Sequence, residues 1–182
     1  MTTGRPRASS RATITEAACE LFLERGYDGT AVGDIAARAG VSRSSFFNYF
    51  DSKAAIIWAG FDERLRRVEA ALAVGGVRPA LEGLAVDLEP DGLALALVHA
   101  DAMGLRDELD RGAGWRQTRI SRAVTARLMT DGVAPLRAEV AGAAHAGAVV
   151  AALGAWANDG PGRAPLAGRL GEALDIAAVT LA

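Results

Sequence analysis

Residues 30 to 53, with the sequence TAVGDIAARAGVSRSSFFNYFDSK, constrain the fold of this chain more than any other segment. Ile35 and Ala36 lie on the apolar side of a first short helix, and Gly40 ends that helix. Ser42 then caps a second helix of about two turns. This spacing predicts a helix-turn-helix, whose second helix is typically presented to the major groove of DNA. The alternative is a generic corner between two helices, in which glycine makes the turn and serine caps.

The second short helix has one apolar side and one polar side. Phe46 and Phe50 are four residues apart, so they share a side and, with Val41, can hold the helix against its domain. Small polar side chains on the other side would let the backbone approach base edges, while residues at the margins would bind phosphate. The residues that we expect at the DNA are Thr30, Ser42, Arg43, Ser44, Ser45, Phe47, Asn48, Tyr49 and Lys53.

Base contacts and phosphate contacts are expected from different members of this set. Arg43 lies at the entry of the helix and can reach a guanine edge or a phosphate, and Ser44 and Asn48 offer small polar groups to base edges. Tyr49 and Lys53 are placed at the margin, where phosphate contacts fix the register of the helix on the duplex. Lys53 is the sole lysine of the chain.

Three helical segments in this order, and with these gaps, resemble the N-terminal DNA-binding domain of the TetR family of transcriptional regulators. The resemblance runs from about Ile14 to Phe61, roughly a quarter of the chain. The matching residues are Ala17, Ala18, Leu21, Phe22, Gly26, Tyr27 and Thr30, then Asp34, Ile35, Ala36, Ala39, Gly40, Val41 and Ser42, and finally Ser45, Phe46, Phe47, Asn48, Tyr49, Phe50, Ser52 and Lys53.

The resemblance implies an all-α homodimer with an effector-binding body, commonly a repressor that a small molecule releases from DNA. It also implies that Ser45, Tyr49 and Lys53 contact phosphate. Phe47 stands where the family often has tyrosine, so one hydrogen bond to DNA is lost and only contacts of the ring remain. Ser44, where the family commonly has glycine or alanine, could add a base contact.

Apolar residues recur with helical spacing along the chain, and no run of β-branched residues alternates as it would in a strand. We therefore expect an all-α protein of about nine helices, with a three-helix helix-turn-helix domain before a helical ligand-binding and dimerisation domain. The expected divisions are a flexible basic arm at 1–8, a helix-turn-helix domain at 9–55, a linking helix at 52–74 and a C-terminal effector-binding and dimerisation domain at 76–182.

Capping residues and glycines predict where individual helices begin and end. The first helix begins at Ser9 or Ser10, and Thr30 is the natural N-cap of the second. The glycines at 112–114 predict a turn, after which Trp115 begins another helix. The expected buried stripes are Ile14, Ala17, Ala18, Leu21 and Phe22 on the first helix and Ile57, Phe61, Leu65, Val68 and Leu72 on the fourth.

Composition and charge exclude several classes of function. The net charge of −2 argues against a protein that coats nucleic acid over its whole surface. Arg5, Arg7 and Arg11 nevertheless form an arm without acids, which can lie along phosphates or be a solvated terminus. A single cysteine, Cys19, excludes an intrachain disulfide and a cysteine-rich metal site, and the N-terminus lacks the apolar region of a secretory signal. We therefore expect a cytoplasmic protein.

The sequence offers little for catalysis. His99 and His145 are the only histidines, and the chain carries no recognisable metal-binding, nucleophile or phosphate-loop motif. We therefore expect no enzyme activity, no catalytic residue, no cofactor and no metal. A helical interaction module whose helix-turn-helix no longer binds DNA is the alternative function.

An uncharged stretch at 140–157 is near the minimum length for a membrane span, but alanine and glycine gain little from lipid. We expect a helix–helix interface there instead. The helix at 135–158 and the final helix from Pro165 would form the four-helix interface of a homodimer that reads a pseudo-palindromic operator in double-stranded DNA. The expected contact side is Gly142, Ala146, Val149, Val150, Leu153 and Trp156.

A site for a small-molecule effector is expected in the C-terminal domain. Leu97, Met103 and Trp115 could line a cavity, with His99 as its polar group. The alternative is an ordinary close-packed core in which the histidine makes its hydrogen bonds within the protein. The arginines Arg116, Arg119, Arg122 and Arg127 would suit the mouth of a pocket for an acyl-CoA or another acid, although most such runs are solvated faces. The expected effector is thus hydrophobic or acyl-CoA-like, bound by Leu97, His99, Met103, Trp115 and Arg119.

Overall fold

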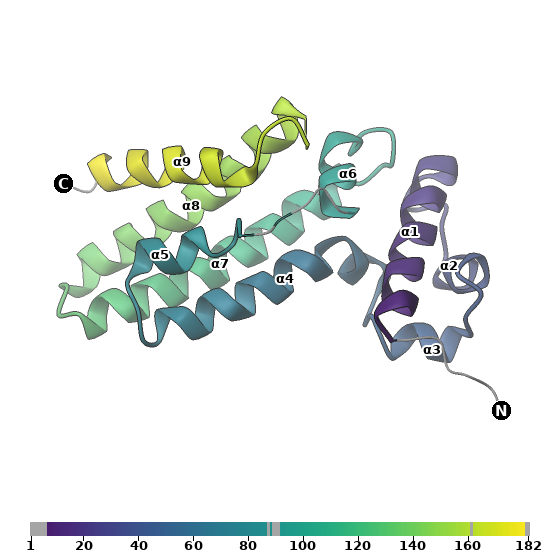
Figure 1. The fold of residues 1–182 in the computed structure, drawn as a ribbon, viewed down its shortest axis with the longest axis horizontal. Helices are drawn as coiled ribbons and strands as arrows, with labels where there is room; N and C mark the ends of the chain where they lie inside the picture. The colour runs from purple at the N-terminus through teal and green to yellow at the C-terminus, as the bar shows by residue number, and fades with distance from the viewer. Residues whose placement is uncertain (1–6, 87, 89–91, 161, 181–182) are drawn as a thin grey trace. The chain divides into compact units, whose positions relative to one another are not determined.

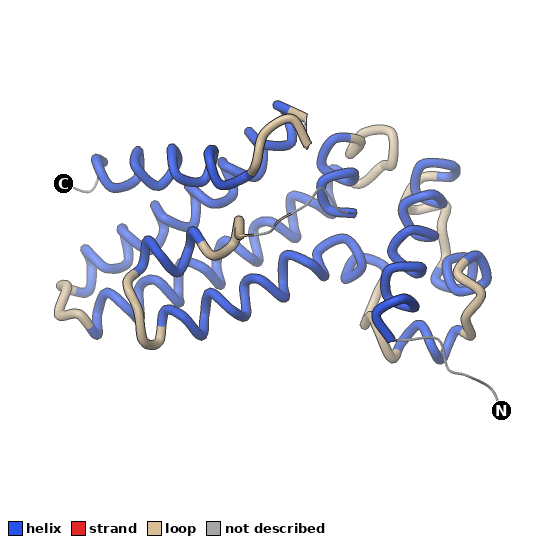
Figure 2. The backbone as a smooth tube through the Cα atoms, in the orientation of Figure 1, coloured by secondary structure: helices blue, strands red, loops and turns tan. Residues whose placement is uncertain are grey.

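The computed structural model describes residues 7–86, 88, 92–160 and 162–180, and this part of the chain is helical with irregular connections (Figure 2). The all-α prediction is therefore confirmed. The predicted arm at 1–8 lies mostly outside the described residues, and the first helix already begins at Arg7, before Ser9 and Ser10. The helices are α1 (Arg7–Arg25), α2 (Val32–Arg38), α3 (Arg43–Phe47), α4 (Lys53–Leu72), α5 (Val77–Glu82), α6 (Gly92–Val98), α7 (Arg106–Thr130), α8 (Pro135–Asp159) and α9 (Leu166–Thr180).

The described chain divides into two compact units. The first contains the residues up to Ala59 together with those between 92 and 109, and the second contains 60–88 and the residues from Asp110 onward. This division differs from the predicted boundary, which placed everything after residue 76 in one C-terminal domain. The reason is that the apolar helix α6 packs against α1 rather than within the second unit.

Helix α1 and the start of α6 approach each other closely in the first unit. A methyl group added at Gly92 would lie 2.9 Å from Thr15 Cγ2 and 3.4 Å from the sulfur of Cys19. The turn after α1 is also tied to the segment after α6, because the N–H of Tyr27 donates to the carbonyl of Met103 over 2.7 Å. The predicted buried stripe of α1 is confirmed and consists of Ile14, Ala17, Ala18, Leu21 and Phe22.

Helix α4 begins one residue after a serine cap, since Ser52 Oγ accepts a hydrogen bond from the N–H of Ala55 over 3.1 Å. The residues of its predicted apolar stripe recur every three or four positions and are all buried. The buried residues of this stripe are Ile57, Phe61, Leu65, Val68 and Leu72.

The predicted turn at 112–114 is wrong, because these glycines lie inside the long helix α7. A helix-interior glycine costs about 1 kcal/mol relative to alanine, which is less than a buried apolar side chain gains. Ile120 and Val124 of α7 are buried, so their packing offsets the two glycines. The chain turns before α7 instead, at Gly104, where φ is +63°. Trp115 therefore lies within a helix and does not begin one.

Helices α8 and α9 run side by side in the second unit (Figure 1), and α8 also contacts α7, since the hydroxyl of Thr125 donates to the carbonyl of Ala138. The contact with α7 is close at Gly142, where an added methyl carbon would lie 2.2 Å from Thr125 Oγ1. By length and composition alone, α8 is long and apolar enough to cross a membrane. One side of α8 is buried by these neighbouring helices of the same chain.

Candidate nucleic-acid interface

The short helix α3 is capped by serine, as predicted. Ser42 has an extended backbone, and its hydroxyl accepts a hydrogen bond from the N–H of Ser45 over 3.0 Å. The hydroxyl oxygens of Ser44 and Ser45 lie 2.9 and 2.8 Å from that of Ser42. Three hydroxyls therefore gather at the start of α3.

The two sides of the α3 segment differ as the sequence predicts. The rings of Phe46 and Phe50 are buried with their centroids 5.9 Å apart, and they hold the segment against the first unit. The opposite side presents polar groups to solvent. Its exposed residues are Arg43, Ser44, Phe47 and Asn48, with Ser45 and Tyr49 half-buried beside them.

Phe47 is an exposed aromatic ring on the outward side of α3, with 47% of its surface accessible. Its ring meets the ring of Phe46 edge to face, and the guanidinium carbon of Arg43 lies 6.0 Å from its centroid. The ring lacks the hydroxyl of a tyrosine, but it can make a cation–π contact with Arg43.

Lys53 does not have the surroundings of an outward phosphate contact. Its ammonium group donates to the carbonyl of Tyr27 over 2.6 Å and to that of Thr30 over 3.2 Å, and it lies 3.9 Å from the centroid of the Tyr27 ring. An ammonium group has three donors, and two of them are used inside the protein. Lys53 therefore fastens the turn between α1 and α2 to the start of α4, contrary to the predicted role.

Thr30 is buried, with 1% of its surface accessible, and cannot present its side chain to DNA. Its hydroxyl donates to the carbonyl of Gly26 over 2.8 Å. The N-cap of α2 is Ala31 instead, and the N–H of Ala31 donates to the carboxylate of Asp34 over 3.0 Å. The predicted N-cap and DNA-binding roles of Thr30 are therefore both wrong, because the hydroxyl is needed to close the preceding turn.

Arg38 of α2 is neutralised by two carboxylates of α1. Its guanidinium lies 2.9 Å from a carboxylate oxygen of Glu20 and 2.8 Å from one of Glu24. The hydrogen bond from Arg38 holds the pKa of Glu24 below its ordinary value, so this carboxylate stays ionised. Arg38 therefore joins α1 to α2 and adds little positive field near α3.

The residues predicted to form an effector cavity are divided between the two units. Leu97, His99 and Met103 belong to the first unit, while Trp115 and Arg119 belong to the second. Met103 is fully buried and His99 is exposed, so the histidine cannot be the polar handle of an enclosed cavity around Met103. The predicted role of His99 as a polar handle is therefore wrong, since α6 packs on α1 and the histidine that follows it lies at the surface.

Trp115 is 55% exposed on α7, between two arginines whose guanidinium carbons lie 5.3 Å (Arg116) and 4.8 Å (Arg119) from its ring. Both arginines are paired with carboxylates of α4. Arg116 Nε donates to Asp62 over 2.8 Å and Arg119 Nε donates to Glu69 over 3.0 Å, each as part of a two-pronged contact. The predicted excess of positive charge on α7 is therefore largely neutralised.

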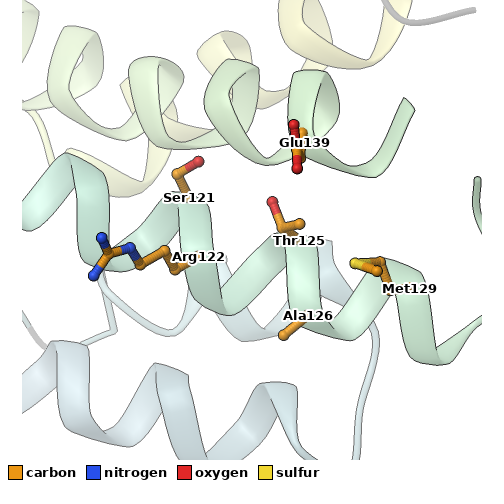
Figure 3. A pocket seen from close by; sticks show the side chains of 6 residues that line it. All are labelled: Ser121, Arg122, Thr125, Ala126, Met129 and Glu139. Carbon is orange, nitrogen blue, oxygen red and sulfur yellow. The ribbon is translucent and has the colours of Figure 1, made fainter. Parts of the chain in front are cut away.

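A groove of about 460 Å³ lies between α7 and α8 in the second unit (Figure 3). Arg122 and Glu139 supply opposite charges to its walls, and Met129 supplies an apolar surface. Arg122 makes no ion pair among the described residues, unlike Arg116 and Arg119. The remaining lining residues are Ser121, Thr125 and Ala126. The sequence singled out Arg122 only as one member of a charged run.

The predicted dimer contact side is buried within the chain itself. Trp156 is buried, and its indole N–H donates to the carbonyl of Ala164 over 3.0 Å at the turn before α9. Gly142 lies against α7, and Val150 is half-buried. The other predicted residues, Ala146, Val149 and Leu153, are also buried. This side of α8 therefore forms the core of the second unit, contrary to the prediction.

Large apolar side chains are exposed at the start of α8 and the end of α9 instead. Leu136 is 74% exposed, and Val140 lies one turn further along α8 on the same side. Ile176 and Val179 are exposed near the end of α9. Because α8 and α9 are antiparallel neighbours, the start of α8 lies beside the end of α9 (Figure 1).

Among the described residues, no group of three metal-ligating side chains is found.

Together, the capped α3, its two-sided residue pattern and the all-helical second unit define a helix-turn-helix transcriptional regulator. The sequence pattern of "Bacterial regulatory proteins, tetR family" matches residues 14–59. The HTH-type transcriptional repressor AcnR of Corynebacterium efficiens is 30% identical over 129 residues, which cover 69% of this chain and 68% of AcnR. The chain belongs to the TetR family of bacterial regulatory proteins.

Other relatives match over shorter regions. The HTH-type transcriptional repressor DhaR of Mycobacterium sp. (strain GP1) is 38% identical over 77 residues, which cover 40% of this chain and 39% of DhaR. The chain spans only between 30% and 39% of the length of this and two further curated relatives.

Solved structures share the fold over nearly the whole chain. Thermus thermophilus FadR, a TetR-family repressor in complex with lauroyl-CoA, has a TM-score of 0.54 and 27% identity, covering 92% of this chain and 93% of that one. NalD of Pseudomonas aeruginosa, the secondary repressor of the MexAB-OprM efflux pump, has a TM-score of 0.59 and 19% identity, covering 94% and 96%. The likeness to NalD concerns the fold alone.

Proposed function

We propose that this protein is a sequence-specific transcriptional repressor that binds a pseudo-palindromic operator through α3 and leaves it when a small molecule binds. The observation that carries the proposal is the arrangement of α3. Phe46 and Phe50 hold the helix from behind, while Arg43, Ser44 and Asn48 remain exposed. This leaves polar groups of suitable size free to reach base edges in the major groove.

Reading a pseudo-palindrome requires two copies related by a twofold axis. The exposed apolar surface at the start of α8 and the end of α9, which includes Leu136, Val140, Ile176 and Val179, favours a second copy as its partner. Exposed apolar residues that cluster on neighbouring helices are typical of protein interfaces. We therefore keep the α8–α9 pair as the dimer interface and assign the contact to this exposed surface.

The effector that we propose is an acyl-CoA or a similar acidic amphiphile. The support is the lauroyl-CoA complex of Thermus thermophilus FadR, whose structure matches this chain over most of its length. The groove between α7 and α8 suits such a molecule, because Arg122 can meet an acidic group and Met129 an apolar one.

DNA binding is tested by footprinting on the region upstream of the protein's own gene, followed by a salt titration on the protected sequence. We expect protection of an inverted repeat, and an affinity that falls steeply with salt, by about 0.9 logarithmic units per phosphate contact and decade of salt. Absence of binding to any promoter DNA would instead favour the helical interaction module without DNA affinity.

Effector binding is tested by thermal unfolding with lauroyl-CoA, with coenzyme A lacking the acyl chain as the control. At a hundredfold excess over Kd, a ligand of the folded state adds about 2.7 kcal/mol, which raises the Tm by roughly 5–10 °C for a chain of this size. Arg122→Gln should reduce that rise. No rise with lauroyl-CoA, and no release of bound DNA by it, would contradict this part of the proposal.

A further inference from the structure

Three of the described cations of the first unit are already engaged by other groups of the protein. Arg38 pairs with two carboxylates of α1, Arg106 pairs with Asp101 over 2.7 Å, and Lys53 donates to backbone carbonyls. A phosphate contact that contributes to the salt dependence of binding needs a cation that can turn toward solvent. Besides Lys53, the cations of this unit that make no ion pair among the described side chains are Arg11, Arg25 and Arg43.

Arg11 belongs to α1 but lies beside the recognition segment, residues 42–50, which contains α3. Its guanidinium carbon is 5.0 Å from the centroid of the Phe50 ring, and the start of α1 lies near α3 (Figure 1). Phe50 directly follows Tyr49, which is half-buried at the end of this segment. Arg43 lies at the other end, at the first residue of α3. The recognition segment therefore carries one unpaired arginine at each end.

Stacking on an aromatic ring suits Arg11 for binding phosphate. A guanidinium that rests on a ring keeps its five N–H donors in its own plane, where they remain available to an anion. The ring also limits the conformations of the long side chain, so less entropy is lost when the guanidinium binds. The attraction to the ring is about 0.5–1 kcal/mol at an exposed site, which orients the arginine without neutralising its charge.

We propose that Arg11, stacked on Phe50, binds a phosphate of the DNA backbone and takes the place that the sequence assigns to Lys53. This inference rests on the proposed DNA-binding function and adds a residue outside the helix-turn-helix to the interface. Arg43 and Arg11 would then bind phosphates at the two ends of the recognition segment. Phosphate contacts at both ends fix its register in the groove, and the bases are read between them.

The test uses the full-length protein and a labelled duplex carrying the inverted repeat from upstream of its gene, titrated between roughly 50 and 200 mM salt. In Arg11→Gln, we expect the slope of log affinity against log salt to become shallower by about one unit per subunit. The affinity of the dimer at physiological salt should fall roughly tenfold or more. Arg11→Lys, which keeps the charge, should retain the wild-type slope.

Arg25→Gln is the matched control, because Arg25 is an exposed arginine at the opposite end of the same helix. It should keep the wild-type slope and affinity. The Tm of Arg11→Gln should change by no more than roughly 4 °C, since only the exposed ring contact is lost. If glutamine destabilises the protein more than this, Arg11→Met serves as the neutral variant, because its apolar stem still covers the ring.

An unchanged slope in the neutral Arg11 variant would overturn the inference. So would an equal loss of slope in Arg25→Gln, because the effect would then reflect net charge rather than a contact. Failure of the wild-type protein to bind any duplex is a different result and would contradict the proposed function itself. If the wild type binds and the salt slope of the variant is unaltered, only the inference about Arg11 is contradicted.

Discussion

Lys53, the sole lysine of the chain, shows how the surroundings of one residue decide its role. Its ammonium group lies between the carbonyls of Tyr27 and Thr30 and over the Tyr27 ring. A charged donor in a partly buried place needs such partners, because an unpaired ammonium would lose its hydration without compensation. These contacts connect the turn after α1 with the start of α4, so they support the position of α3 between them.

Replacing Lys53 by methionine should lower the free energy of unfolding by about 2 kcal/mol, because hydrogen bonds to a charged group contribute about 1.5–3 kcal/mol. The apolar stem is kept, so the loss reports the ammonium contacts. Urea denaturation followed by circular dichroism measures it. Arg25→Met, at an exposed position of α1, is the control and should change stability by less than about 0.5 kcal/mol. Equal stability of the two variants would mean that the Lys53 contacts contribute nothing.

Glycines within helices have opposite roles on α7 and α8. Gly142 of α8 lies where an added methyl carbon would be 2.2 Å from Thr125 Oγ1 and 2.7 Å from the carbonyl oxygen of Ser121. The glycine is therefore required for the close contact of the two helices. Gly114 of α7 is exposed, and no atom lies within 4 Å of an added methyl carbon. It carries the cost of glycine in a helix without a packing benefit.

Alanine should therefore change stability in opposite directions at these two glycines. Gly142→Ala should lower the free energy of unfolding by about 1–3 kcal/mol, because part of the clash is with backbone that cannot move aside. Gly114→Ala should raise it by up to about 1 kcal/mol. The two variants are compared by chemical denaturation under one set of conditions. A loss of stability in both would show that Gly114 has a role beyond the space around it.

Helices α4 and α7 are joined by two arginine–carboxylate contacts, and the contact between Arg116 and Asp62 is the more buried of the two. Removing one partner of a buried pair leaves a charge without compensation, whereas replacing both by apolar residues is often nearly neutral. Arg116→Met alone should thus lower the free energy of unfolding by about 3 kcal/mol. Adding Asp62→Leu should restore most of that loss. Additive losses in the double variant, measured by urea denaturation, would contradict this account.

At the scale of the whole molecule, the exposed apolar surface of α8 and α9 favours a dimer. Light scattering at micromolar concentration should give the mass of two chains. Leu136→Glu combined with Ile176→Glu should give the mass of one, because two charges would be buried without partners in each half of the interface. Val74→Glu is the control, since Val74 is 87% exposed in the turn after α4 and lies outside that surface. A wild-type mass of one chain would contradict the proposed dimer.

The sequence alone determined the helical fold, the serine cap of α3 and the buried stripes of α1 and α4. These features depend on apolar periodicity and on capping residues such as Ser42. Both involve residues only a few positions apart, so they can be identified in the sequence. The tertiary structure decided which neighbours surround each side chain. It turned Thr30 and Lys53 inward and placed Arg11 beside Phe50.

The same limit explains the predictions that failed in the rest of the chain. Apolar periodicity identifies the sides of α6 and α8 that will be buried, but it does not identify the helix that buries them. Helix α6 packs on α1, and the small side chains of α8 pack within the chain rather than on a second copy. Contacts between residues distant in sequence depend on the relative positions of whole helices, which only the tertiary structure supplies.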